Sequence, residues 1–286
     1  MGVKKQVGMQ YFLELIFEEM ITIKKLIIIL AILILILSGC GIAPDPPEPN
    51  GVVYRGFFVG VGKYENGWTL PSPAGNTEKL EDLFSQCGFG EGETGFEIIE
   101  KFTNYDATKE NILNGISDIF YDADDNDVSY FYYMGHGGLK NGIPIITPTD
   151  YTGCICKSIT VHELEEYLSM IAGTKVVFLE TCHAGNFIDK NIILEPFTEF
   201  SLDLLNKEGY QVLASSAGNQ YTWDSYSFNG SYFCRYLIEG CEDLQADINK
   251  DEIVDISELY QYIKFNVTKQ TVQIYPNESK FPIVEY

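Results

Sequence analysis

Short apolar runs alternate with amphipathic segments along the chain from residue 52 onwards. The run Val128–Met134 is almost entirely aromatic or β-branched, which is typical of a strand covered on both faces. In Asn76–Cys87 the apolar residues fall on one helical face, and Gly88 is suited to ending the helix. By the same criteria we expect further strands at 52–61, 96–102, 175–179 and 211–214, and further helices at 108–121, 161–171, 232–240 and 256–266. This alternation predicts an α/β fold with a mostly parallel central sheet.

The first 40 residues have the pattern of an export signal. Lys24 and Lys25 precede an unbroken apolar run of 12 residues, Leu26–Leu37. A membrane-spanning helix needs about 20 apolar residues, so this run is typical of a signal peptide instead. The run ends in Ser-Gly-Cys40, which resembles the lipobox of bacterial lipoproteins, whose Cys becomes the lipid-modified first residue. We expect residues 1–39 to be a lipoprotein signal peptide; the alternative is an ordinary signal peptide with a chance cysteine.

Two neighbouring features bear on this interpretation. Glu14, Glu18 and Glu19 are unsuited to the basic start of a signal peptide, whereas the Lys-Lys pair shortly after Met20 is well suited, so we expect translation to begin at Met20. Residues 40–51 are rich in Pro and Gly, as in a tether. We therefore expect an extracytoplasmic domain at 52–286, anchored through lipid to a bacterial cell membrane.

The composition restricts the partners of this domain. The chain has 286 residues, 45% of them hydrophobic, which excludes an intrinsically disordered protein. Its 19 basic and 41 acidic residues give a formal net charge of -22. Nucleic-acid binding needs clustered Lys and Arg, so we expect no nucleic-acid partner. An anionic membrane surface would repel the chain, which leaves a hydrophobic or covalent membrane link.

A histidine and a cysteine follow two of the predicted strands. Val128–Met134 leads into Gly-His136-Gly137-Gly, and the strand at 175–179 leads into Glu-Thr-Cys182-His183. Ligands of open parallel sheets bind beyond the carboxyl ends of the strands. A thiol needs a neighbouring base to become an effective nucleophile, and imidazole titrates near neutral pH. The two residues are 46 positions apart, close to the roughly 50 expected for caspases.

Two segments carry a specific family resemblance. Tyr132–Gly138 (YYMGHGG) and Val177–Gly185 (VFLETCHAG) resemble the signature segments of caspase-like cysteine peptidases, most closely metacaspases and bacterial caspase-domain proteins. The resemblance covers about residues 52–270. It implies a three-layer sandwich and an endopeptidase that acts on peptide or protein substrates without a cofactor for its chemistry. It also implies that Cys182 is the nucleophile, that His136 is the acid–base group, and that the N–H groups of Gly137 and Cys182 stabilise the oxyanion; His183 is expected to be positional.

The resemblance also bears on specificity, through Glu180. The acid at this position in metacaspases selects Arg or Lys at the P1 residue of the substrate, so we expect cleavage after Arg or Lys. Metacaspases carry a second acid where this chain has Thr77. Legumain-type relatives, which cut after Asn, also have Glu before their Cys. A legumain-like peptidase or transamidase therefore stays open, as does a catalytically silent caspase-like binding module.

A possible calcium loop lies near the carboxyl terminus. Residues 247–258 follow the EF-hand pattern, with a backbone carbonyl at the seventh position and side-chain oxygens at the others. Glu252 stands where the pattern has Gly for a turn with positive φ. We expect a structural Ca²⁺ site; the alternative is a solvated acidic turn. The expected ligands are Asp247, Asn249, Asp251, Ile253, Asp255 and Glu258.

Overall fold

The computed structural model describes residues 51–286 except 87–95, 189–203, 226–229, 243 and 286. The predicted signal peptide at 1–39, the lipid-modified Cys40 and the tether up to residue 50 lie outside the described residues. Among the helices that are described, none is both long enough and apolar enough to cross a membrane.

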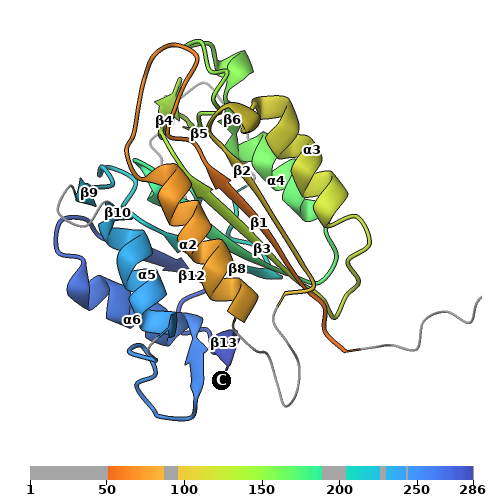
Figure 1. The fold of residues 1–286 in the computed structure, drawn as a ribbon, viewed down its shortest axis with the longest axis vertical. Helices are drawn as coiled ribbons and strands as arrows, with labels where there is room; N and C mark the ends of the chain where they lie inside the picture. The colour runs from red at the N-terminus through yellow and green to blue at the C-terminus, as the bar shows by residue number, and fades with distance from the viewer. Residues whose placement is uncertain (1–50, 87–95, 189–203, 226–229, 243, 286) are drawn as a thin grey trace, which may run out of the picture. The chain divides into compact units, whose positions relative to one another are not determined.

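A six-stranded sheet runs through the middle of the domain (Figure 1). Its order is β12-β8-β7-β3-β1-β2, and all neighbours are parallel except β12, which is antiparallel to β8. The mostly parallel sheet predicted from the sequence is thus confirmed. The strands are β1 (Tyr54–Gly60), β2 (Ile98–Thr103), β3 (Val128–Met134), β7 (Thr174–Glu180), β8 (Tyr210–Ala214) and β12 (Gln273–Tyr275).

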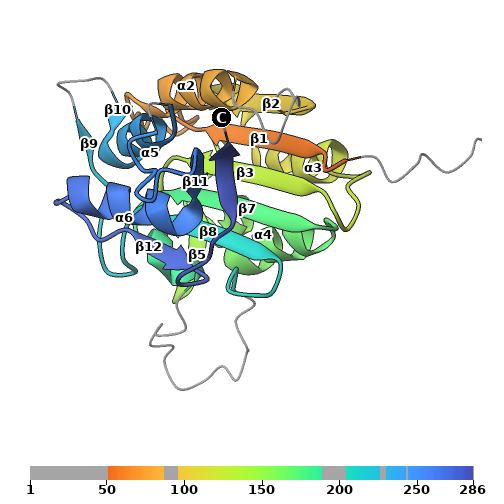
Figure 2. The same ribbon diagram turned by 90° about the horizontal axis from the view of Figure 1, so that it is seen from below.

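Helices cover both faces of this sheet, which makes the three layers that we expected (Figures 1 and 2). One face packs against α2 (Pro73–Gln86), α5 (Tyr232–Glu242) and α6 (Ile256–Asn266), and the other against α3 (Lys109–Ile119) and α4 (Val161–Ser169). Because side chains alternate along a strand, β3 contributes to two cores. Tyr130 and Tyr132 pack in the core under α2, whereas Phe131 and Tyr133 pack in the core under α3.

Side-chain caps explain where three of these helices begin. Thr108 accepts a hydrogen bond from the N–H of Asn111 at the start of α3. Thr160 and Glu163 form a reciprocal capping box at α4, and Asp255 and Glu258 form another at α6. These caps satisfy N–H groups that the first helical turn leaves without partners.

Several short strands were not predicted. They are β12 at one edge of the central sheet, β4 (Gly137–Lys140), β5 (Ile143–Ile146) and β6 (Ile159–Thr160) in one small sheet, β9 (Asp224–Ser225) with β10 (Gly230–Ser231), and β11 (Ile253–Asp255) with β13 (Pro282–Glu285). Each has two to four residues, too few for an alternating pattern to be distinguished from a loop. The β4–β5 and β9–β10 pairs matter most, because both contribute residues to the site described next.

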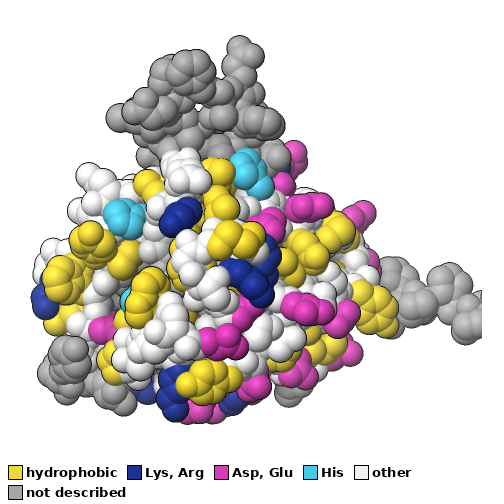
Figure 3. All heavy atoms as spheres, turned by 90° about the horizontal axis from the view of Figure 1, so that it is seen from above, with side chains coloured by type: hydrophobic (Ala, Val, Ile, Leu, Met, Phe, Trp, Pro, Cys, Tyr) yellow, Lys and Arg dark blue, Asp and Glu magenta, His cyan; other side chains and the backbone are white. Residues whose placement is uncertain are grey.

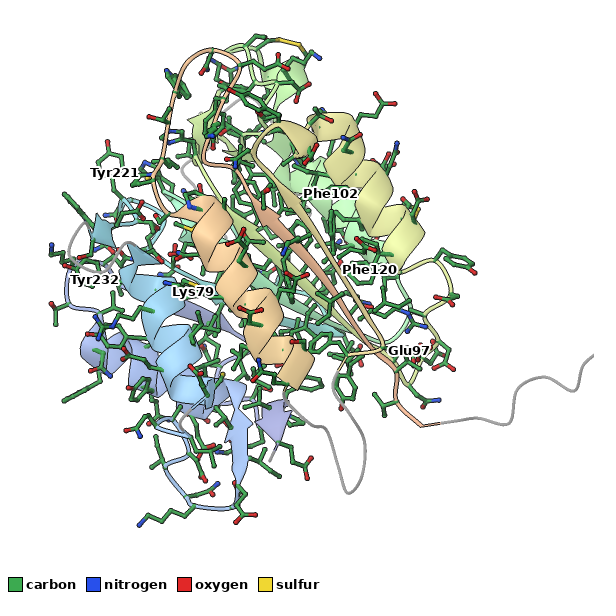
Figure 4. All side chains as sticks on the ribbon, in the orientation of Figure 1. Lys79, Glu97, Phe102, Phe120, Tyr221 and Tyr232 are labelled. Carbon is green, nitrogen blue, oxygen red and sulfur yellow. A yellow bond between two sulfur atoms is a disulfide. The ribbon has the colours of Figure 1, made fainter. Side chains whose placement is uncertain are left out.

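The cysteines without a predicted role fall into different environments. Cys154 and Cys156 form a disulfide in a loop, the yellow bond near the top of Figure 4. Cys234 and Cys241 are buried thiols of α5, and Cys87 lies outside the described residues.

Candidate active site

The sheet brings His136 and Cys182 to one place. Strands β3 and β7 are parallel neighbours, with Met134 opposite Glu180. His136 and Cys182 each follow two residues after this pair, so adjacent strands deliver them to the same edge. Both side chains line one groove of about 690 Å³. Figure 3 looks from above onto the molecule, where apolar and histidine side chains lie among basic and acidic ones.

Hydroxyl groups hold the turn that carries Cys182. The carbonyl oxygen of Thr181 accepts hydrogen bonds from the Thr222 hydroxyl at 2.8 Å and the Ser216 hydroxyl at 3.1 Å. Cys182 itself is partly buried. Burial raises the pKa of its thiol and nearby Asp224 adds to this, against a backbone hydrogen bond from Thr222. The sulfur is therefore a thiol at neutral pH in this conformation.

The backbone of His136 is fixed on both sides. Its N–H donates to the Tyr64 hydroxyl at 2.7 Å, and its carbonyl oxygen accepts from the Tyr133 hydroxyl at 2.8 Å and the Thr147 N–H at 3.0 Å. The imidazole ring lies 5.3 Å from the ring of Trp68, centroid to centroid. Burial lowers the pKa of His136, although the charge of Asp224 opposes the shift. A neutral imidazole and a neutral thiol thus line the same groove.

Gly137 occupies a position where no side chain fits. A Cβ there would come within 2.3 Å of Thr181 Oγ1 and 2.7 Å of the carbonyl oxygen of Ile145. The hydrogen bond from the Thr147 N–H to the His136 carbonyl oxygen extends the antiparallel ladder of β4 and β5. In such a ladder, hydrogen-bonded residue pairs alternate with pairs that are not hydrogen-bonded. The N–H of Gly137, next along β4, therefore turns away from β5. This arrangement is compatible with its predicted role as an oxyanion donor.

Glu180 is a buried carboxylate on the α2 face of the sheet. It is only 1% exposed, and its Oε2 accepts a 2.6 Å hydrogen bond from the Tyr132 hydroxyl. Its Oε1 has no hydrogen-bond partner among the described residues. Burial raises the pKa of Glu180 to about 7, with Asp224 adding to the rise and the Ser231 and Tyr132 hydroxyls opposing it. The carboxyl group therefore carries less than full charge at neutral pH and has one oxygen ready to accept a donor.

Asp224 was missed by the sequence reasoning. It lies on β9 opposite Ser231 on β10, and its carboxylate accepts a hydrogen bond from the Ser72 hydroxyl. Burial raises the pKa of Asp224, and its charge affects His136, Cys182 and Glu180. No motif or hydrophobic pattern marks this residue in the sequence. Its place depends on a hairpin of two-residue strands.

The position of the second metacaspase acid holds no carboxylate here. Thr77 is fully buried on α2, and its hydroxyl donates to the carbonyl oxygen of Pro73 at 2.8 Å. The second carboxylate near Glu180 is that of Asp224, from a distant part of the chain.

His183 directly follows the candidate nucleophile in a left-handed conformation, with φ of 63°. Its Nδ1 lies 2.8 Å from the carbonyl oxygen of Gly218, and its ring contacts that of Tyr221. These contacts hold the turn and agree with the positional role predicted for His183.

The predicted calcium loop connects α5 to α6. The structure brings carboxylate oxygens of Asp247, Asp251 and Glu258 within 4.8 Å of one another. Glu252, which stands in place of Gly, takes the left-handed conformation with φ of 67°. Asp255 is engaged elsewhere, because it caps α6 and pairs with Lys280 at 2.8 Å.

The two remaining predicted ligands, Asn249 and Ile253, have structural roles in the loop. The side chain of Asn249 accepts from the N–H of Asp251, and Ile253 begins β11. The loop therefore has a positive-φ turn at its sixth position and three carboxylates close together. Asp255, at the ninth position, instead caps α6.

The comparisons with known proteins agree with this fold. A family model described as a caspase domain matches residues 56–285. The search of curated proteins finds no match. Among solved structures, the crystal structure of protein GSU0716 from Geobacter sulfurreducens matches with a TM-score of 0.58 and 14% sequence identity. The match covers 78% of this chain and 92% of that chain, and at this identity it is evidence of the fold alone.

Proposed function

This chain belongs to the caspase-domain family of cysteine peptidases, and on that premise we propose that it is an active endopeptidase with a Cys182/His136 dyad. The observation that supports the proposal is the shared groove, whose lining includes a thiol and a neutral imidazole from adjacent strand ends. A silent binding module has no need for this pairing, for the hydrogen bonds that hold both turns, or for the glycine that follows His136.

The proposed reaction has two stages. His136 takes the thiol proton as the sulfur of Cys182 bonds to the carbonyl carbon, and the N–H groups of Gly137 and Cys182 stabilise the oxyanion. The carbon–nitrogen bond then breaks, and the leaving amine takes the proton from His136. In the second stage water attacks the thioester and gives a proton to His136. The carbon–sulfur bond breaks, the acid product leaves, and His136 returns the proton to the sulfur, which restores the thiol and the neutral imidazole.

The second part of the proposal is that the enzyme cuts after Arg or Lys. A basic P1 side chain that reaches Glu180 would supply a donor to the unpartnered Oε1 and a positive charge beside a buried carboxylate. Asp224 supports the same preference, because its charge lies near Glu180. A charge-assisted hydrogen bond in a buried site is stronger than a neutral one. The net charge of -22 further favours cationic peptides over anionic ones.

A panel of fluorogenic peptides that differ at P1 tests both parts. Wild-type protein is expected to hydrolyse Arg and Lys peptides, and Cys182→Ala is expected to hydrolyse none. A preference for Asn would favour the legumain-like alternative, and ligation to an added amine would favour a transamidase. Absence of both hydrolysis and Cys182-dependent labelling by a thiol probe would favour the binding module.

We also propose that the protein is a lipoprotein held outside the cytoplasm through Cys40. The signal-like sequence supports this, and so does the Cys154–Cys156 disulfide, since disulfides persist mainly in oxidising compartments. Metabolic labelling with a fatty acid should mark the wild-type protein and not Cys40→Ala. Equal labelling of both would contradict the proposal.

For the loop at 247–258 we propose structural Ca²⁺ binding. The three clustered carboxylates and the turn at Glu252 support it, because hard oxygen ligands suit Ca²⁺. Bound Ca²⁺ would neutralise the clustered carboxylates and hold the junction of α5 and α6. No step of the peptidase reaction depends on it.

A further inference from the structure

The groove at the dyad and the carboxylate of Glu180 lie on opposite faces of the sheet. Glu180 follows the alternation of Val176 and Phe178, which pack in the core under α2 and α5. The groove instead adjoins Tyr64, whose ring belongs to the core under α3 and α4 and contacts the rings of His136 and Trp68. A peptide lying across Cys182 would therefore meet two different environments, one on each side of the scissile bond.

Large apolar side chains stand half exposed around the groove. Trp68 is 49% exposed, Leu139 on β4 is 45% exposed, and Tyr221 is 63% exposed. Figure 4 shows Tyr221 projecting outward beyond the end of α2 that is nearer the active site. Trp68 is supported from behind, since its ring lies 6.1 Å from that of Tyr151 and 5.3 Å from that of His136. Apolar surface that is held rigid and left open to solvent is typical of a binding site.

The charge of this groove differs from that of the Glu180 side. Among the described residues that line the groove, Lys140 is the one charged side chain, because His136 is neutral. The lining thus differs from the protein as a whole, which is strongly acidic. A basic side chain would therefore find no carboxylate in this lining. A large apolar side chain would instead cover Trp68 and Leu139 and remove their exposed surface from water.

We infer that the wall formed by Trp68 and Leu139 is the subsite for the residue after the scissile bond, P1′, and that it selects a large aromatic or aliphatic side chain. The inference rests on the proposed peptidase activity, in which His136 gives a proton to the leaving amine. The leaving amine therefore lies against His136, and the side chain of P1′ lies beside Trp68. The substrate class is thus a peptide with a basic residue followed by a bulky apolar one.

Internally quenched peptides with Lys fixed at P1 test this inference, because they keep a real residue at P1′. The peptides carry Phe, Leu, Gly, Asp or Lys at P1′, and kcat/KM is measured with the full chain. We expect Phe and Leu to exceed Gly, Asp and Lys by roughly tenfold or more, as hydrophobic pockets typically allow. Trp68→Ala is expected to reduce kcat/KM for the Phe peptide about tenfold and for the Gly peptide less than threefold.

Two further variants complete the test. One changes the subsite at a second position, and the other is a control outside the groove. Leu139→Ala changes the second apolar residue of the subsite and is expected to reduce the Phe-over-Gly ratio about threefold. Phe265→Ala removes an equally large apolar side chain that is 84% exposed on α6, and it should leave the ratio unchanged. Thermal unfolding of each variant verifies that it is folded.

The outcomes separate this inference from the proposed function. If no peptide is cut in a Cys182-dependent way, the proposed function fails and the inference fails with it. If Lys peptides are cut at equal rates whatever the P1′ residue, the function stands and the inference is overturned. The inference is also overturned if the preference for Phe survives in both Trp68→Ala and Leu139→Ala.

Discussion

Carboxylates cluster in two regions of this molecule, and the two regions differ in the hydrogen bonds that the carboxylates accept. Near the nucleophile, Glu180 is 1% exposed and one of its oxygens has no partner among the described residues. In the loop at 247–258, the backbone N–H of Lys250 donates to Asp247 at 2.6 Å and that of Ile253 donates to Asp251 at 3.1 Å. The loop carboxylates range from the exposed Asp251 to the buried Glu258, and backbone N–H groups already donate hydrogen bonds to them, so a ligand adds to an arrangement that is stable without it. Glu180 also accepts hydrogen bonds, but burial still raises its pKa to about 7, so a cationic ligand would relieve an existing cost.

The largest expected effect is the loss of peptidase activity when Glu180 is substituted. Glu180→Gln keeps the size and the acceptor for Tyr132 but removes the charge. We expect kcat/KM for Arg and Lys peptides to fall roughly 300-fold, within the range for losing one partner of a buried charge pair. Glu110→Gln, a change at an exposed acid of α3, should have no effect. A fall of less than threefold would remove Glu180 from the P1 subsite.

Glu180→Gln should raise the free energy of unfolding at high pH, although it lowers activity. The pKa of Glu180 is about 7 in the folded protein and near the ordinary value of 4.5 when unfolded. The folded state therefore holds the proton to higher pH, and wild type loses stability as pH rises from 4.5 to 7. Gln cannot ionise, so at pH 8 Glu180→Gln should be more stable than wild type by about 3 kcal/mol.

Urea unfolding at pH 8 and at pH 4 measures this difference. We expect the gain at pH 8 and near equality at pH 4, where the carboxyl group is protonated in both states. A gain of equal size at both pH values would mean that packing, and not ionisation, separates the two proteins.

The fold and the shared location of His136 and Cys182 could be predicted because their signals are local in the sequence. The strand Val128–Met134 has the same bounds in the structure as in the prediction, since seven consecutive buried residues leave little ambiguity. His136 and Cys182 each directly follow a predicted strand, and parallel order alone places such residues together. The helices were located within a few residues for the same reason, with capping residues refining their starts.

The acidic surroundings of the dyad could not be predicted in the same way. Asp224 reaches the site through β9 and β10, which have two residues each and no periodic pattern. The unpartnered state of Glu180 depends on packing between α2, α5 and the sheet, and no short sequence pattern encodes it. In the calcium loop the sequence argued against the turn at Glu252, yet that residue takes a positive φ while its N–H donates to Asp247.

A smaller effect is expected at the calcium loop. If the loop binds Ca²⁺ as proposed, a concentration 100 times the Kd should stabilise the folded protein by about 2.7 kcal/mol, which raises Tm by roughly 5–10 °C. Asp247→Asn should abolish the rise, whereas Asp118→Asn, at an exposed acid of α3, should preserve it. Calorimetry with Ca²⁺ or with a chelator makes the measurement, and identical Tm values in the two would contradict the proposal.

The smallest expected effect lies at Asp224, which is partly buried and lies near the nucleophile. Its negative charge helps to raise the pKa of the Cys182 thiol, because a nearby anion disfavours the thiolate. Asp224→Asn removes that charge, lowers the pKa of the thiol, and should speed alkylation of Cys182 by iodoacetamide roughly threefold at pH 8. The same variant should bind Lys peptides less tightly, since one of two carboxylates near P1 is gone. Faster alkylation together with a higher KM would assign Asp224 to both the nucleophile and the substrate, whereas a change in neither would show that its charge influences neither of them.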